Sequence, residues 1–205
     1  MLRSSRVLVG VLLAGSTAVG LVTAAGSASA ATAQRHSAKA STFTGKISCA
    51  LTGTVTASPA LTLSTSQTTT LTYKATLSKC TGSTKKGSVS ITGASLSGTS
   101  KASVDCTTLA ASGLPALSGS VTYKAKGGSV AATKFSFNGG TMDITSSPVT
   151  FTFPASGGKG TSTGSFSGKA SLKADLPSSD GVATLTSDCK SGLKSLKLAS
   201  GTFKA

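Results

Sequence analysis

The sequence predicts an all-β protein, an antiparallel β-sandwich or flattened barrel of roughly ten strands that disulfide bonds stabilise. The first observation is strict alternation: Ile47, Cys49, Leu51 and Val55 share one parity, and polar residues occupy the other. This period of two indicates a half-buried strand. The second is a spacing of 8–12 residues between similar runs, which is typical of sandwiches and barrels. The third is the presence of four cysteines.

The N-terminal residues have the pattern of a secretory signal peptide. Arg3 and Arg6 precede an apolar run over 7–22, and Ala28-Ser29-Ala30 supplies an A-x-A cleavage site. We therefore expect a signal peptide over 1–30, a flexible leader over 31–42 and a single all-β domain over 43–205. The protein is expected to be secreted, without a membrane span after cleavage.

The composition predicts a thin hydrophobic core. Cleavage after Ala30 would leave 175 residues, of which 32, or about 18%, are Leu, Val, Phe or Ile. One domain of this size is ordinary for an all-β chain. A core this lean is expected to need covalent support.

The four cysteines, Cys49, Cys80, Cys106 and Cys189, are expected to form two disulfides, because an exported chain folds in an oxidising compartment. Four cysteines allow three connectivities. Sequential pairing, Cys49–Cys80 and Cys106–Cys189, is favoured, since an antiparallel strand pair would bring Cys49 beside Cys80. Cys106 and Cys189 also share a context, each following Asp and preceding a turn with glycine.

The alternation of apolar and polar residues predicts where the other elements lie. A turn is expected at Ser58–Leu61, a bulge at Gly93 and a helical turn at 107–112. The expected further strands are 70–78, a run from Val89, 119–126, a run from Phe166 to Leu176, 182–186 and 193–202.

The strongest local signal is a predicted three-stranded meander over 135–153. Phe135 and Phe137 lead into Asn138-Gly139-Gly140, and alternating apolar residues follow to Phe153. Asn-Gly between alternating runs favours a tight hairpin. The four phenylalanines of this segment are expected to pack in the core rather than to form a ligand platform.

A weak internal repeat is also present. The segment from Cys49 through Pro59 to Tyr73 is echoed by the segment from Cys106 through Pro115 to Tyr123, with different spacers. Either a duplicated half-sheet or coincidence in a chain rich in Ala, Ser and Thr would produce it.

The mature chain would carry 18 basic and five acidic residues, a formal charge of +13. One interpretation is attraction to anionic cell-envelope polymers or nucleic acid. The other is solubility, with Lys protecting exposed strand edges from pairing. Specific nucleic-acid binding is not expected, because the charge is dispersed and is not interleaved with aromatic residues.

No motif for catalysis stands out. The single histidine, His36, lies in the predicted leader, and the five Asp lie mostly in or beside turns. No C-x-x-C motif and no calcium-loop spacing occurs. We therefore expect no enzyme activity, no cofactor and no metal site.

The chain resembles a group of uncharacterised secreted β-rich proteins of the actinobacterial type. The resemblance rests on the signal ending A-S-A-A, the strand I-S-C-x-L-x-G-T-V, the turn K-C-T-G-S and the closing strand C-x-x-G-L-K-x-L-x-L-x-x-G-T from Cys189 to Thr202. It implies export and a disulfide-bonded β fold, and brings no known active site. The expected function is that of a non-catalytic extracellular or envelope-associated interaction protein of unknown ligand; nonspecific binding of anionic polymers through the Lys-rich surface is the alternative.

Overall fold

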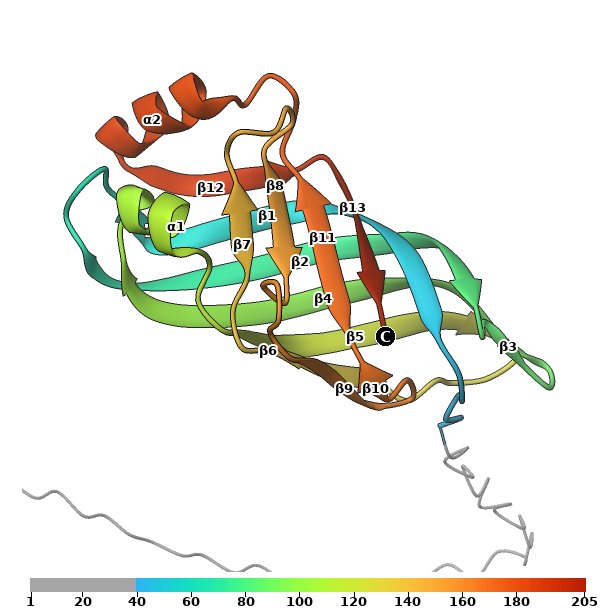
Figure 1. Cartoon of the computed structure of the whole chain (residues 1–205). Helices are drawn as coiled ribbons and strands as arrows, with labels where there is room; N and C mark the ends of the chain where they lie inside the picture. Colours follow the sequence, from blue (N-terminus) through green and yellow to red (C-terminus); the bar gives the residue numbers. More distant parts are fainter. Residues whose placement is uncertain (1–39) are drawn as a thin grey trace, which may run out of the picture. The chain divides into compact units, whose positions relative to one another are not determined.

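The structure is a computed structural model that describes residues 40–205. The predicted signal peptide and most of the predicted leader therefore lie outside the described residues. Residues 40–205 form one antiparallel sheet and two short helices (Figure 1). Neither of these helices is long and apolar enough to cross a membrane.

The sheet contains thirteen strands within this part of the chain, and the helices are α1 (Cys106–Ser112) and α2 (Val182–Ser191). The strands are β1 (Ile47–Leu61), β2 (Gln67–Gly82), β3 (Lys85–Lys86), β4 (Val89–Val104), β5 (Leu117–Lys126), β6 (Thr133–Phe137), β7 (Thr141–Asp143), β8 (Thr150–Phe153), β9 (Gly160–Gly164), β10 (Gly168–Lys169), β11 (Ser171–Asp175), β12 (Leu193–Leu198) and β13 (Ser200–Lys204).

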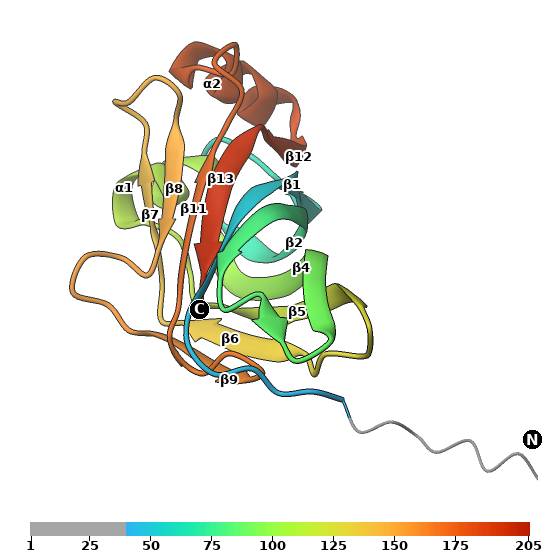
Figure 2. The ribbon, with the colours of Figure 1, turned by 90° about the vertical axis from the view of Figure 1, so that its right-hand side faces the viewer.

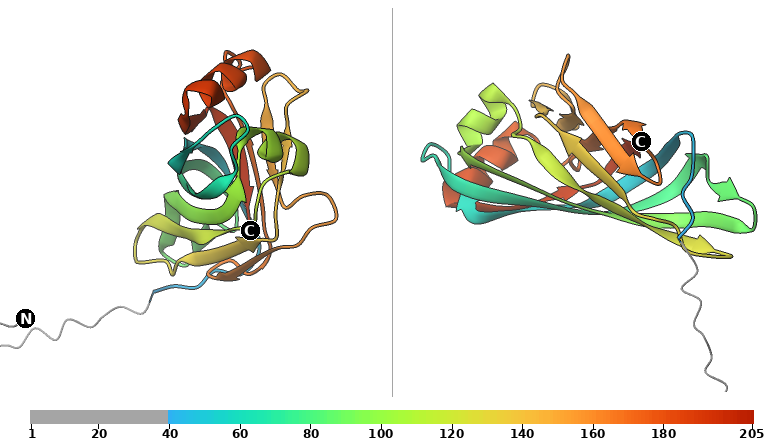
Figure 3. Two further views of the ribbon diagram at one scale, coloured as in Figure 1. Left: turned by 90° about the vertical axis from the view of Figure 1, so that its left-hand side faces the viewer. Right: turned by 90° about the horizontal axis from the view of Figure 1, so that it is seen from below.

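The strand order is β10-β9-β6-β5-β4-β2-β1-β13-β11-β8-β7, with β12 pairing only with β1 and β3 only with β4. The sheet curls into a half-barrel, so that its two halves face each other (Figures 2 and 3). This arrangement confirms the predicted antiparallel, disulfide-bonded all-β fold in its flattened-barrel form.

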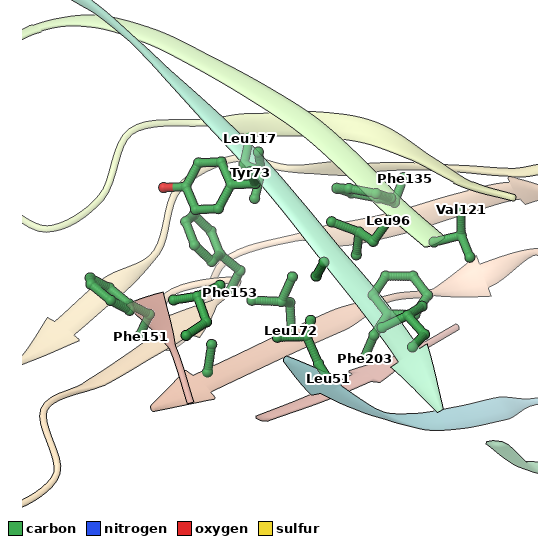
Figure 4. Packing of buried hydrophobic residues seen from close by; sticks show 14 of the residues in the cluster. Leu51, Tyr73, Leu96, Leu117, Val121, Phe135, Phe151, Phe153, Leu172 and Phe203 are labelled. Carbon is green, nitrogen blue, oxygen red and sulfur yellow. The ribbon is translucent and has the colours of Figure 1, made fainter. Parts of the chain in front are cut away.

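The core lies on the concave face of this sheet, where the inward parity of each strand meets the opposite wall (Figure 4). All seven phenylalanines outside the predicted signal peptide are buried. Phe137 packs against Phe135 and Phe153, with ring centroids 5.4 and 5.6 Å apart. Phe135 also packs on Phe203, at 5.6 Å, so aromatic contacts join strands from both halves of the sheet.

Two facing glycines make room for one of these rings. Gly98 on β4 pairs with Gly119 on β5. A Cβ on Gly119 would lie 2.7 Å from the Phe135 ring and 2.2 Å from the Ser97 carbonyl oxygen. The ring therefore covers bare backbone, a contact that any larger residue at this position would prevent.

The predicted meander over 135–153 is wrong in its first hairpin. β6 pairs with β5 and β9, whereas β7 pairs only with β8. Asn138–Gly140 therefore carries the chain from one half of the sheet to the other. The local turn preference of Asn-Gly is overridden because Phe135 and Phe137 are buried by pairing with β5 and β9.

The predicted turn at Ser58–Leu61 is also wrong, because β1 continues through it to Leu61. The pairing of β1 with β12 is irregular between Thr56 and Leu61. Pro59 lies in this interruption, where its missing N–H costs no ladder hydrogen bond.

The segment predicted as a strand at 182–186 is instead the start of α2. The other local predictions hold better: the register of β4 against β5 shifts between Ile91 and Gly93, which confirms the bulge. The helical turn at 107–112 is confirmed as α1. The two copies of the weak repeat differ, since Cys49 lies within a strand and Cys106 begins a helix.

Ser41 of the predicted leader contacts the loop between β5 and β6, and Phe43, the first residue of the predicted domain, is buried. Ser41 donates its N–H to the Ser129 carbonyl, and its own carbonyl accepts from Ala131 N–H. Phe43 is buried against Phe166, with ring centroids 5.7 Å apart.

Candidate functional site

An apolar cavity of about 240 Å³ lies at the end of the half-barrel that carries both helices. Its walls come from β1, β2, β7, β8, β12, α1, α2 and the loops after β1, β7 and α1. No charged side chain lines it. The lining is Val55, Leu61, Leu63, Leu71, Tyr73, Cys106, Thr107, Leu109, Ala110, Leu114, Met142, Ile144, Phe151, Val182, Leu185, Thr186, Cys189, Leu193 and Leu196.

The cavity exists because the sheet divides at Ala199. The sequence predicted one strand over 193–202, but the chain forms β12 and β13, both paired with β1. On its other side β13 pairs with β11, whereas β12 has no second partner strand. Apolar side chains of β12 and of β7–β8 therefore face a space that no strand fills, and the helices cover it.

Helix α1 forms one wall and is fixed at its N-terminus by a capping box. The buried Asp105 carboxylate accepts from the Thr108 N–H at 2.7 Å, and the Thr108 hydroxyl lies 2.9 Å from the Asp105 N–H, which donates to it. The hydroxyl of Ser66 also donates to this carboxylate. The hydrogen bond from Ser66 contributes most to lowering the pKa of Asp105, and the bond from the Thr108 N–H comes next. These hydrogen bonds hold Leu109 and Ala110 toward the cavity.

Helix α2 lies beside α1 and forms a second part of the cover. Val182, Leu185, Thr186 and Cys189 all line the cavity. Their spacing of i, i+3, i+4 and i+7 places them on one face of a helix. The strand predicted over 182–186 is part of this helix, and the spacing of these four residues is the sequence signal for it. No side chain caps its N-terminus at Gly181, so it depends on contacts of this one face.

A disulfide between Cys106 and Cys189 joins the two helices, and both cysteines line the cavity. The second disulfide, Cys49–Cys80, links β1 to β2 away from it. This is the sequential pairing that the sequence favoured. The sequence did not predict that one of the pairs would bridge a cavity.

The apolar side chains around the cavity are incompletely covered. Five partly buried Leu, Ile and Met side chains pack against the described core, and all five line the cavity: Leu63, Met142, Ile144, Leu185 and Leu196. Val182, with 46% of its surface exposed, is the single large apolar residue of 40–205 that is classed as exposed. Apolar surface is therefore left accessible here rather than being scattered over the molecule.

The turn after β7 is also held in place. The Asp143 carboxylate accepts from the Thr145 hydroxyl at 2.7 Å and from the N–H groups of Thr145 and Ser146. These hydrogen bonds lower the pKa of Asp143, and the bond from the Thr145 hydroxyl contributes most. They fix the segment that presents Met142 and Ile144.

Tyr73 supplies the cavity's distinctive polar atom. Its ring packs edge-on against Phe153, with centroids 6.0 Å apart, and only 4% of the residue is exposed (Figure 4). Burial raises the pKa of Tyr73 far above its usual value, so its hydroxyl stays protonated.

A separate groove lies on another part of the surface, lined by four exposed lysines. Lys46, Lys159, Lys169 and Lys204 contribute to it, and no Asp or Glu side chain does. Lys204 lies between Ser48 and Ser171 in neighbouring strands. Four of the dispersed lysines of the sequence are thus brought together here, from the residue before β1, from β13 and β10, and from the loop before β9.

Within residues 40–205, no group of three or more His, Cys, Asp or Glu side chains is placed to hold a metal ion. A scan against models of protein families finds no match for the chain, and searches among curated proteins and among solved structures find none either.

Proposed function

We propose that the protein is a secreted, non-catalytic binding protein that holds a small apolar ligand in the cavity between α1, α2 and the sheet. The observation that carries this proposal is the cavity itself, whose lining is apolar and without charge. Ligand sites are typically concave and lined mainly by apolar side chains with a few polar groups. Two disulfides are typical of proteins from an oxidising, extracellular-type environment.

A fluorescent apolar probe, N-phenyl-1-naphthylamine, tests this function. Ala110 of α1 lines the cavity, whereas its neighbour Ala111 is exposed and lies outside the lining. Ala110→Leu fills the cavity with a good helix former, and Ala111→Leu is its matched control. We expect saturable binding by the wild type and Ala111→Leu, and at least a tenfold loss in Ala110→Leu. No saturable binding by the wild type, or equal binding by both variants, would contradict the proposal.

The lysine groove favours a second candidate function, the binding of an anionic polymer. Four lysine side chains converge there, and even with a carboxylate at Ala205 three positive charges remain in excess. Such a groove attracts a polyanion by releasing its counterions, with an affinity that falls steeply with salt.

Elution from heparin distinguishes this groove from general charge attraction. One variant replaces Lys46, Lys159, Lys169 and Lys204 with Ala. The control replaces Lys74, Lys101, Lys124 and Lys134, which are exposed and outside the groove. Both lose the same charge, so a groove site predicts elution at lower salt for the first variant only. Equal elution would leave only nonspecific attraction.

A further inference from the structure

The hydroxyl of Tyr73 is the unused polar group of the cavity. No hydrogen bond of this hydroxyl is found among the described residues, although only 4% of the surface of Tyr73 is exposed. Buried hydroxyls are normally paired, because leaving one unpaired costs free energy. The fully enclosed unpaired hydroxyls of residues 40–205 are those of Ser100 and Ser162, outside the cavity lining, whereas the Tyr73 hydroxyl is not enclosed in this way and stays accessible to an occupant. The other tyrosine of the core follows this rule: the Tyr123 hydroxyl donates to the Thr133 hydroxyl at 2.9 Å.

The other hydroxyls of the lining are already engaged. Thr107 donates to the Leu63 carbonyl at 2.6 Å, and Thr186 donates to the Val182 carbonyl at 2.8 Å. Only Tyr73 therefore offers a free O–H to an occupant. It lies on the sheet side of the cavity, beside Val55 and Leu71, and the helices lie on the opposite side.

The uncharged lining of the cavity indicates that the ligand is uncharged. A carboxylate or ammonium group inside the cavity would lose its hydration without meeting an opposite charge. Such transfer is strongly unfavourable. A neutral polar group that accepts one hydrogen bond has no such cost.

We propose that the ligand is a neutral amphiphile, an aliphatic body with one acceptor oxygen such as that of a ketone, alcohol or ester, which accepts a hydrogen bond from the Tyr73 hydroxyl. This inference rests on the proposed function of the cavity and adds the chemical class of the ligand. Tyr73 fixes the orientation of the ligand, and the apolar walls supply most of the affinity.

Displacement of N-phenyl-1-naphthylamine by decane, 2-decanone and decanoate tests the assignment in the wild type, Tyr73→Phe and Tyr123→Phe. We expect Tyr73→Phe to weaken binding of 2-decanone by about three- to tenfold and to leave decane unchanged. Tyr123→Phe, outside the lining, should change neither. In the wild type, decanoate should bind at least tenfold more weakly than 2-decanone.

The outcomes separate the two proposals. If the probe and decane bind but Tyr73→Phe affects ketone and alkane equally, the hydrogen-bond assignment is wrong and the cavity function stands. If decanoate binds most tightly, the neutral class is wrong. If the wild type binds none of these compounds, both proposals fail. Tyr73→Phe removes no hydrogen bond within the protein, so its melting temperature should match that of the wild type and misfolding should not obscure the result.

Discussion

In the middle of the half-barrel, Phe137, Phe153 and Phe203 are fully buried, whereas at the helical end Met142, Leu185 and their neighbours remain half-buried. The same sheet and the same alternation of residues produce both regions. In the middle, β13 pairs on both sides and aromatic rings reach across the concave face. At the helical end, β12 pairs only with β1, and two short helices replace the missing strand.

The difference indicates how the few large apolar side chains of this protein are distributed. Large aromatic side chains complete the packing of the middle, and the helical end receives smaller, flexible residues around an unfilled volume. Continuous strand pairing fixes the first region. The second depends on capping bonds, on one helix face and on the Cys106–Cys189 bond.

Removing each disulfide in turn should give the largest difference between the two regions. Cys106→Ala/Cys189→Ala opens a loop of 83 residues and Cys49→Ala/Cys80→Ala one of 31. Chain entropy predicts losses of about 4.5 and 3.5 kcal/mol in the free energy of unfolding, measured in urea. Only the first pair should also lose binding of N-phenyl-1-naphthylamine, because it joins the helices over the cavity. Equal loss of binding in both variants would show that the cavity does not depend on this local link.

Truncation of one side chain in each region gives the next largest contrast. Phe153→Ala should lower the free energy of unfolding by about 4 kcal/mol, because it leaves a new void among packed rings. Met142→Ala should cost only about 1 kcal/mol, because its half-buried side chain already faces an open cavity. Thermal or urea unfolding measures both. Similar losses would mean that the helical end is as tightly packed as the middle.

The sequence predicted best what local patterns determine. Alternation placed β1, β2 and β5, the glycine at 93 marked the bulge, and a helical turn was expected at 107–112. The Cys49–Cys80 disulfide followed from the expected pairing of β1 with β2, and Cys106–Cys189 from the matching contexts of its two cysteines. These features depend on neighbours in sequence or on adjacent strands.

The crossing at Asn138-Gly139 and the cavity were missed because they depend on distant pairing, whereas α2 was missed because its local pattern is ambiguous. Asn138-Gly139 has the signal of a hairpin, yet β6 and β7 lie in opposite halves of the sheet, because β9, from further along the chain, takes the place beside β6. The apolar face of α2 was present in the sequence, but a run beginning Val182 and ending in Thr186 suited a strand equally well. The cavity was not predictable, since it arises where β12 and β13 part at Ala199.

The smallest expected effect concerns the pH dependence of the helical end. Hydrogen bonds from Ser66 and Thr108 lower the pKa of Asp105 in the folded state. A carboxyl group with a lowered folded pKa stabilises the fold above its unfolded pKa, about 3.9, and this stabilisation is lost as the pH falls through the folded value. Asp105→Asn keeps a good helix cap but removes the charge.

We therefore expect Asp105→Asn to lower the melting temperature by about 2–4 °C at pH 6. The difference from the wild type should shrink below pH 4, because protonation then removes the same charge in the wild type. Asp180→Asn, in the turn before α2, is the control and should follow the wild type throughout. Melting scans from pH 2.5 to pH 7 measure the melting temperature of each variant. If the difference between Asp105→Asn and the wild type stayed constant with pH, the effect would come from the shape of the side chain and not from its charge. If probe binding by the wild type also weakens over the same acidic range before the sheet unfolds, the helical end is the less stable of the two regions.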